Sequence, residues 1–337
     1  MGDCCGCFLS MSLSSIGLLI LIVAVLDWLK RRNQRNASLE NQHVVITGGS
    51  SGIGKQVGIL AAQRGANVTL LARDLKKLEE ASVEVRAAAK DDNQKINYFS
   101  VDVTNYEKTD NVIQRCAEEI GPVDILICCA GYAYPSKLED IPLHHVKGMM
   151  DINFMGTLHV VRSVLPSMKS RRKGKIACTS SVGGLFGIYG YTAYGASKFA
   201  LRGFAEALQM EVKPFNISVT LCFPPDTDTP CLQEENKVKP LETKLISEMA
   251  AVMKPEDVAC SILNDTMTGD FFSCTGFDGN LTSVICAGMS PISSVFGLII
   301  QVCFMGIFRA VGLGYVYYFN RLVKNCAAQK EKLKKAE

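Results

Sequence analysis

Short apolar runs alternate with helix-like segments from His43 to about Gly276, and this alternation limits the fold more than any other feature of the chain. Continuous apolar strands separated by helices are typical of a parallel sheet that is buried on both faces. We therefore expect an α/β fold built on a doubly wound parallel sheet. The expected strands are His43–Thr47, Asn67–Ala72, Ile96–Val101, Val123–Cys129, Lys175–Ser180 and Ile217–Phe223.

A glycine-rich turn follows the first expected strand. Glycines let the backbone approach a pyrophosphate closely, and the N-terminus of the next helix offers free N–H groups to the same anion. The turn therefore predicts a dinucleotide site at Gly48, Ser50, Ser51, Gly52, Ile53 and Gly54. Residues 48–52 also fit G-x-S-x-G, the nucleophile elbow of α/β-hydrolases. Hydrolases of that type place their catalytic histidine last, and the sequence has no histidine after His159.

Three polar residues further along predict acid–base chemistry on a carbonyl. Tyr194 and Lys198 lie four residues apart in an expected helix, Tyr191–Val212, and so share one face. A nearby cation lowers the pKa of a tyrosine, and we expect Lys198 to do so for Tyr194. Ser181, at the end of a strand, can donate a hydrogen bond to the carbonyl. In this order the three residues indicate hydride transfer to or from a ketone.

The end of the second strand predicts which dinucleotide binds. An acidic residue there would favour NAD, but the sequence has Arg73 and then Lys77. Positive charge suits a 2′-phosphate, so we expect NADP(H). A solvated basic helix start is the alternative for Lys77. Asp102, after the third strand, is placed to meet the adenine ring, and a simple loop or capping role is its alternative.

Over residues 42–276 these motifs resemble the short-chain dehydrogenase/reductase family. Ser181, Tyr194 and Lys198 are similar to its catalytic residues, and Asn153 is similar to the asparagine of its proton relay. The resemblance implies a Rossmann-type fold with further cofactor contacts at Asp102, Val103, Ala130, Gly131, Tyr194, Lys198 and Pro224. The sequence departs from the family at Cys128-Cys129, where asparagines are usual, and at Pro225, where glycine is usual.

A second set of residues narrows the expected substrate. Phe223–Pro230 and Lys239–Thr243 resemble family members that reduce keto-sphingoid bases. The resemblance implies NADPH-dependent reduction of a long-chain keto-sphingoid base at the cytosolic face of the endoplasmic reticulum. The alternatives are a reductase of another bulky lipid ketone (steroid, retinoid or very-long-chain ketoacyl-CoA) or a non-catalytic membrane scaffold.

Acidic residues after the last strand are candidates to meet the substrate's amine. A sphingoid base is cationic, and the expected partners are Asp226, Asp228, Glu234 and Glu235. Such Asp/Thr/Pro clusters also commonly form simple turns.

The first residues predict a membrane anchor. Residues 4–26 carry no charge and are long enough to cross a bilayer core of ~30 Å. Lys30, Arg31, Arg32 and Arg35 follow, and by the positive-inside rule they place the next domain in the cytosol. A cleaved signal peptide is the alternative, but no basic n-region or small-x-small site is present. Acylation of Cys4, Cys5 or Cys7 stays open.

A second apolar stretch, residues 281–319, is interrupted only by Arg309. It is barely long enough for two crossings, so we expect an interfacial or re-entrant segment. A buried extension of the core or an oligomer interface is the alternative, and a homo-oligomer stays open. The final residues, Lys334–Glu337, resemble a dilysine retrieval signal of the endoplasmic reticulum.

Composition excludes some classes of protein. The net charge is +3 without a basic, aromatic-rich tract, so we expect no nucleic-acid partner. No Cys/His spacing predicts a metal site, and several of the fourteen cysteines fall in or beside expected strands, which indicates free thiols in a reducing compartment. The expected regions are an anchor (1–29), a basic linker (30–41), an NADP-binding catalytic domain (42–280), a membrane-associated segment (281–320) and a basic tail (321–337).

Overall fold

The computed structural model describes residues 13–35, 37–292 and 294–336. A seven-stranded sheet forms its centre, all strands are parallel, and their order is β3-β2-β1-β4-β5-β6-β7. The strands are β1 (His43–Thr47), β2 (Asn67–Ala72), β3 (Ile96–Ser100), β4 (Ile125–Cys128), β5 (Gly174–Thr179), β6 (Ile217–Phe223) and β7 (Phe272–Cys274). The expected doubly wound parallel sheet is therefore confirmed.

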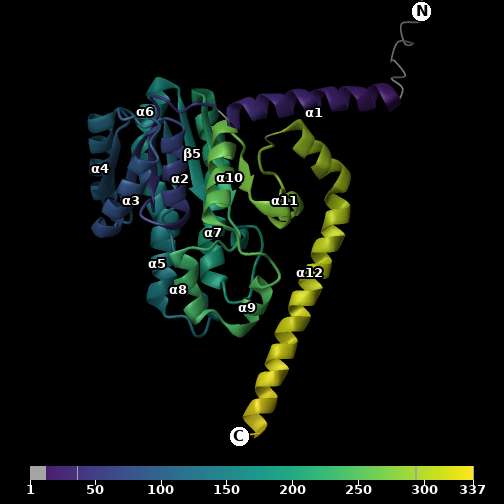
Figure 1. Ribbon diagram of the computed structural model, residues 1–337. Coiled ribbons are helices and arrows are strands. Elements are labelled where there is room, and N and C mark those ends of the chain that lie inside the picture. Colours follow the sequence, from purple (N-terminus) through teal and green to yellow (C-terminus); the bar gives the residue numbers. More distant parts are fainter. Residues whose placement is uncertain (1–12, 36, 293, 337) are drawn as a thin grey trace, which may run out of the picture.

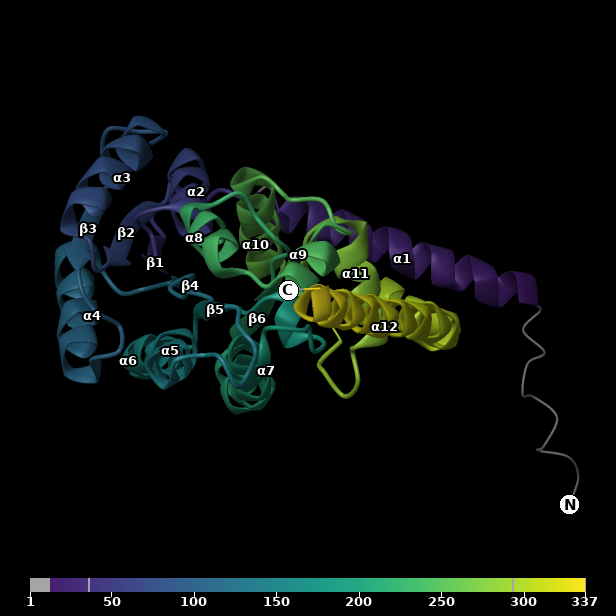
Figure 2. The same cartoon turned by 90° about the horizontal axis from the view of Figure 1, so that it is seen from below.

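Helices cover both faces of this sheet (Figures 1 and 2). One layer contains α2 (Gly52–Gln63), α3 (Leu75–Ala87) and α10 (Pro255–Thr268). The other contains α4 (Tyr106–Ile120), α6 (Thr157–Arg171) and α7 (Thr192–Val212). Each layer buries its apolar side chains against the sheet, which explains why the strands are apolar on both faces.

The sheet reverses its strand order between β1 and β4. In open α/β sheets, ligands bind beside the carboxyl ends of the strands at such a reversal. The turn after β1 and the turn after β4 both open at this edge, so the expected cofactor residues lie at the right place in the topology.

Several short elements follow the last strand that the sequence predicts. They are α8 (Pro230–Val238), α9 (Leu241–Ser247), β7 and α11 (Gly276–Ile285). β7 is only three residues long. Before α6, helix α5 (Leu143–Met149) continues without a break into a π-helical segment, Met150–Gly156.

Helix α1 spans Leu13–Arg35 and so takes in half of the expected linker. Its apolar side chains are largely exposed, among them Leu21, Leu26 and Trp28. Whether it enters a bilayer stays a prediction. The cysteines considered for acylation, Cys4, Cys5 and Cys7, lie outside the described residues.

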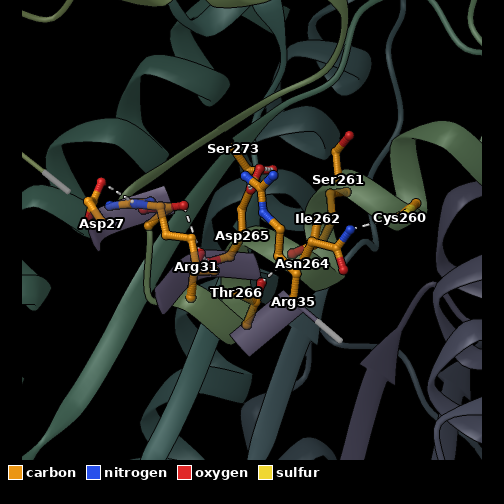
Figure 3. A network of polar contacts seen from close by, with 12 residues as sticks. Asp27, Arg31, Arg35, Cys260, Ser261, Ile262, Asn264, Asp265, Thr266 and Ser273 are labelled. Carbon is orange, nitrogen blue, oxygen red and sulfur yellow. Dashed lines mark hydrogen bonds and ion pairs between the residues drawn. The ribbon is translucent and has the colours of Figure 1, made fainter. Parts of the chain in front are cut away.

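The C-terminal end of α1 is fixed to the domain by ion pairs (Figure 3). Arg31 pairs with Asp270, and Arg35 Nη2 lies 3.4 Å from Asp265 Oδ1 on α10. Ser273 on β7 donates a hydrogen bond of 2.8 Å to the other oxygen of Asp265. Arg31 and Arg35, two of the basic residues after the apolar segment, are thus partners of acidic groups in the domain.

Helix α12, Val295–Ala336, runs for 42 residues along one side of the molecule (Figure 1). Because α12 is one continuous helix, residues 295–319 of the apolar stretch contain no turn that could separate two membrane crossings. Within the described residues, Val295–Leu333 is the one segment long and apolar enough to cross a membrane by length and composition. Seen from below, α12 lies beside α9 and α11 (Figure 2). Lys330 near its end forms a 2.6 Å ion pair with the buried Glu242 on α9.

All eleven cysteines in the described part of the chain are free. Cys128, Cys178 and Cys222 are buried within the sheet, as their positions in apolar runs predict.

Candidate active site

The glycine-rich turn leaves no room for side chains at its key positions. A Cβ on Gly48 would lie 2.8 Å from the backbone nitrogen of Ala130, and one on Gly54 would lie 2.4 Å from the carbonyl oxygen of Gly48. Gly48 and Gly52 also have φ values of +67° and +52°, which favour glycine. Ser51 precedes α2 without making a side-chain capping bond to it. The turn therefore offers close backbone and uncapped amides, as a pyrophosphate requires.

The other predicted residues of the turn are partly buried. Ser50 and Ser51 are half-buried within it, and Ile53 packs against the core between α2 and the sheet.

Arg73 lies at the carboxyl end of β2, and its side chain is exposed. Ser100 fixes the backbone there by donating a 2.7 Å hydrogen bond to the Arg73 carbonyl oxygen. No salt bridge engages Arg73 within the described residues. Lys77 differs, because its ammonium lies 3.9 Å from Asp74, which also caps α3. Arg73 is therefore the better placed cation for a 2′-phosphate.

Asp102 and Val103 follow β3. One oxygen of the exposed Asp102 accepts hydrogen bonds from the Thr104 amide at 3.0 Å and the Thr104 hydroxyl at 2.9 Å. This is the loop role considered above, and it does not involve the second oxygen. Val103 is buried against Gly156, and its carbonyl oxygen lies 2.9 Å from His159 Nδ1.

The structure brings Ser181, Tyr194 and Lys198 together. Ser181 follows β5, and its side chain shares a hydrogen bond with that of Tyr194. Lys198 is buried on the same face of α7, with Nζ 5.6 Å from the centre of the Tyr194 ring. Its ammonium donates a 2.9 Å hydrogen bond to the Thr179 carbonyl oxygen. This arrangement agrees with the helix spacing.

The expected lowering of the Tyr194 pKa is not seen. Burial raises the pKa of Tyr194, and the negative charge of Glu235 raises it further. Burial also lowers the pKa of Lys198 to about 8, which weakens it as a cation. Tyr194 therefore stays protonated at neutral pH and has a proton to donate, as ketone reduction requires.

Asn153 is fully buried within the π-helical segment, a distortion that often marks functional sites. Its amide nitrogen donates to the Tyr132 carbonyl at 3.1 Å and to the Ser197 hydroxyl at 2.9 Å. Its oxygen accepts from the Tyr132 amide at 3.0 Å. Asn153 therefore locks the turn after β4 onto α7.

The backbone of Ala130 and Gly131 forms that turn. Thr47 Oγ1 accepts a 3.2 Å hydrogen bond from the Ala130 amide, which ties the turn to β1. A Cβ on Gly131 would lie 2.8 Å from Asn153 Oδ1 and 3.6 Å from Lys198 Nζ. Only glycine lets these groups approach so closely, so Gly131 lies directly against the lysine ammonium.

Cysteines replace the family's asparagines without leaving a gap. The thiol of Cys129 lies 3.4 Å from the Thr179 hydroxyl, while Cys128 is buried in β4 beside Cys178. Pro224 is buried, and its carbonyl oxygen accepts a 3.2 Å hydrogen bond from the Val182 amide. Pro224 therefore holds the segment that follows the catalytic serine.

A cavity of about 270 Å³ opens beside the catalytic residues. Ser181 and Tyr194 contribute to its wall, and so do residues far along the chain. Its apolar lining includes Phe186 after β5, Ile285 on α11, and Tyr315, Val316 and Phe319 on α12. The cavity therefore joins a polar reaction centre to a surface that suits a long apolar group.

Two of the four expected acidic residues line this cavity. Asp226 and Glu235 do so, whereas Asp228 is exposed elsewhere and Glu234 is an exposed partner of Lys237. The sequence predictions did not include Tyr191, which also lines the cavity, or Lys239, which is buried against both acids. The available signal for Lys239 was its position four residues after Glu235, at the end of α8.

The comparisons with known proteins agree with this geometry. A family model described as short chain dehydrogenase matches residues 42–240. A 3-dehydrosphinganine reductase from Danio rerio is 47% identical over 300 residues, which cover 89% of this chain and 90% of that protein. A 3-ketodihydrosphingosine reductase from Bos taurus is 46% identical over 297 residues, which cover 88% and 90%. The crystal structure of levodione reductase shares the fold, with a TM-score of 0.63 at 20% identity over 68% of this chain and 91% of the other.

Proposed function

This chain belongs to the short-chain dehydrogenase family, and we propose that it reduces 3-ketosphinganine to sphinganine with NADPH. The observation that carries the choice of substrate is the apolar cavity that reaches Ser181 and Tyr194. A long-chain keto-sphingoid base has a polar end with the ketone and one long alkyl chain. The polar end fits the reaction centre, and the chain fits the lining from α11 and α12.

The residues at the edge of the sheet where the strand order reverses, between β1 and β4, fit a dinucleotide with a 2′-phosphate. The turn at Gly48–Gly54 has the close backbone and uncapped amides for a pyrophosphate. Arg73 supplies the positive charge for a 2′-phosphate in place of the acid that favours NAD. Asp102 and Gly131 border the same edge. NADPH, when bound, supplies the hydride.

The side chains of this chain supply orientation and the proton. Ser181 donates a hydrogen bond to the ketone oxygen and fixes its position. Tyr194, protonated at neutral pH, donates its proton to the oxygen as negative charge develops there. Lys198 stabilises the tyrosinate that results, and its pKa of about 8 keeps much of it cationic near neutrality. Asn153 positions the turn that carries Gly131 against Lys198.

The chemistry of the substrate also favours a membrane location. The apolar stretch of α12 contributes to the cavity while its other side chains, such as Val302 and Tyr317, are exposed. An apolar helix with one face on the cavity and another available to lipid suits a substrate that partitions into a bilayer. We propose that α1 and α12 associate with the endoplasmic reticulum membrane and that the catalytic domain faces the cytosol.

Oxidation of NADPH by the full-length protein in membranes tests the proposal. Four carbonyl compounds are compared: 3-ketosphinganine, a steroid ketone, the aldehyde retinal and a very-long-chain ketoacyl-CoA. We expect 3-ketosphinganine to give the highest kcat/KM. Faster reduction of one of the others would reassign the substrate, and no turnover of any would favour a non-catalytic role.

A further inference from the structure

A charge-compensated pair of carboxylates lies at the polar end of the cavity. The Lys239 side chain is 2% exposed, and its ammonium lies 3.0 Å from Glu235 Oε1 and 3.3 Å from Asp226 Oδ2. Two carboxylates share one ammonium, so the group carries one net negative charge when all three are ionised. The buried lysine between the two acids also holds both carboxylates in place.

Glu235 contacts Tyr191, a neighbour of the proton donor, as well as Lys239. The Tyr191 hydroxyl donates a hydrogen bond to Glu235 Oε1, and the rings of Tyr191 and Tyr194 lie 5.3 Å apart between centres. Lys239 also lies closest to Oε1, and within the described residues no hydrogen bond engages Oε2. Because Glu235 lines the cavity, this second oxygen is left to bind a cation there.

The other charges around the cavity do not offset this group. Asp278 on α11 and Arg309 on α12 also contribute to the wall, and their charges are opposite in sign. The lining as a whole therefore keeps the negative balance that Glu235 and Asp226 create beside Tyr194.

We propose that Glu235 binds the ammonium group of the substrate and makes the enzyme select 2-amino ketones over plain ketones. This inference rests on the proposed function. In 3-ketosphinganine the carbon that bears the ammonium is bonded directly to the ketone carbon. Once Ser181 and Tyr194 hold the ketone, the ammonium must lie beside them, where Glu235 is. Asp226 and Lys239 act as positioning residues, because they hold that carboxylate.

Glu235→Gln tests this role with two substrates. The variant keeps the size and an oxygen that can accept from Tyr191, but it removes the charge. The substrates are 3-ketosphinganine and the same molecule with hydrogen in place of the amino group. We expect kcat/KM for the amino ketone to fall at least tenfold, mainly through KM, because a charge pair is lost. Any change in the acidity of Tyr194 affects both substrates alike, so the ratio of kcat/KM for the amino ketone to that for the deaminated ketone should fall at least tenfold.

Glu234→Gln is the matched control. Glu234 is the neighbouring residue and has the same side chain, but it is exposed and pairs with Lys237 on the surface. We expect Glu234→Gln to leave kcat/KM unchanged for both substrates. An equal loss on both substrates with Glu235→Gln, or no loss on either, would overturn the proposal.

The wild-type enzyme provides a second test if Glu235→Gln does not fold. It should prefer the amino ketone to the deaminated ketone at least tenfold in kcat/KM. Reduction of both with equal efficiency would overturn the role of Glu235 while leaving the proposed function intact. Failure of the wild type to reduce either ketone would instead contradict the proposed function itself.

Discussion

Replacing Asp265 with Asn is expected to stabilise the catalytic domain at neutral pH. Asp265 lies on α10 under the end of α1 (Figure 3), and burial raises its pKa from 3.8 to about 6. A shift of roughly 2 units corresponds to about 3 kcal/mol of destabilisation when the group must be ionised in the folded state. Asn has nearly the same shape, can still accept the hydrogen bond from Ser273, and carries no charge.

The ion pair with Arg35 opposes this gain but is the smaller effect. Arg35 is 48% exposed and lies 3.4 Å from Asp265, so the pair contributes less than about 1 kcal/mol. Because the pKa of about 6 already contains this opposing effect, the net expectation is a gain of about 3 kcal/mol, or roughly 6–12 °C in Tm for a domain of this size.

The dependence of stability on pH predicts where Asp265→Asn is more stable than the wild type. Because the folded pKa of Asp265 is raised, its contribution to stability is complete below about pH 4 and is lost as the pH rises through about 6. The Asn variant should therefore exceed the wild type near pH 7.5 and lose that advantage near pH 4. Thermal unfolding of both proteins in detergent at the two pH values measures the difference.

Asp257→Asn is the matched control, since Asp257 lies on the same helix but is exposed. Its effect should stay within about 1 kcal/mol at both pH values. If Asp265→Asn were less stable than the wild type near pH 7.5 and equal to it near pH 4, the ion pairs would outweigh desolvation and the reasoning would fail.

Three further predictions concern the reaction, the cofactor and the topology. Tyr194→Phe should lower kcat at least about a hundredfold while NADPH binding, measured by fluorescence, is kept, and near-normal turnover would exclude Tyr194 as the proton donor. Arg73→Ala should raise the Kd for NADPH far more than that for NADH, whereas equal effects would show that Arg73 does not contact the 2′-phosphate. Asn280, an exposed N-x-Thr site, should carry no glycan in a cytosolic domain, and a gel shift after endoglycosidase would place it in the lumen. Asn264 is a poorer reporter, because its side chain on α10 accepts a hydrogen bond from Arg64 at the end of α2.

Local patterns in the sequence predict the sheet and the spacing of the candidate site residues. β1, β4 and β6 are largely apolar and buried, so adjacent residues indicate their burial, whereas only Ile96 of β3 is buried. Gly48, Gly54, Tyr194 and Lys198 act through spacing along one turn or one helix, and the structure keeps those relations.

Properties that depend on distant residues could not be predicted in the same way. The pKa of Tyr194 rises because the side chain is buried and because Glu235, from a helix that begins well after α7, adds a negative charge. β7 has too few residues for a periodic signal, and its place follows from pairing with β6. The pairing of Lys239 with both Asp226 and Glu235 requires the fold of the loop that connects them.

Because α12 lies against the cavity, the residues proposed for the reaction and those proposed to contact the alkyl chain come from different parts of the chain. The matched family region, residues 42–240, contains Ser181, Tyr194 and Lys198, which carry the reaction in our proposal. Ile285, Tyr315 and Phe319, which face the alkyl chain in our proposal, all lie beyond it. Changes in the last quarter of such a protein could therefore exchange one lipid for another while the reaction stays the same. Two relatives could then share every catalytic residue and still differ in what they recognise.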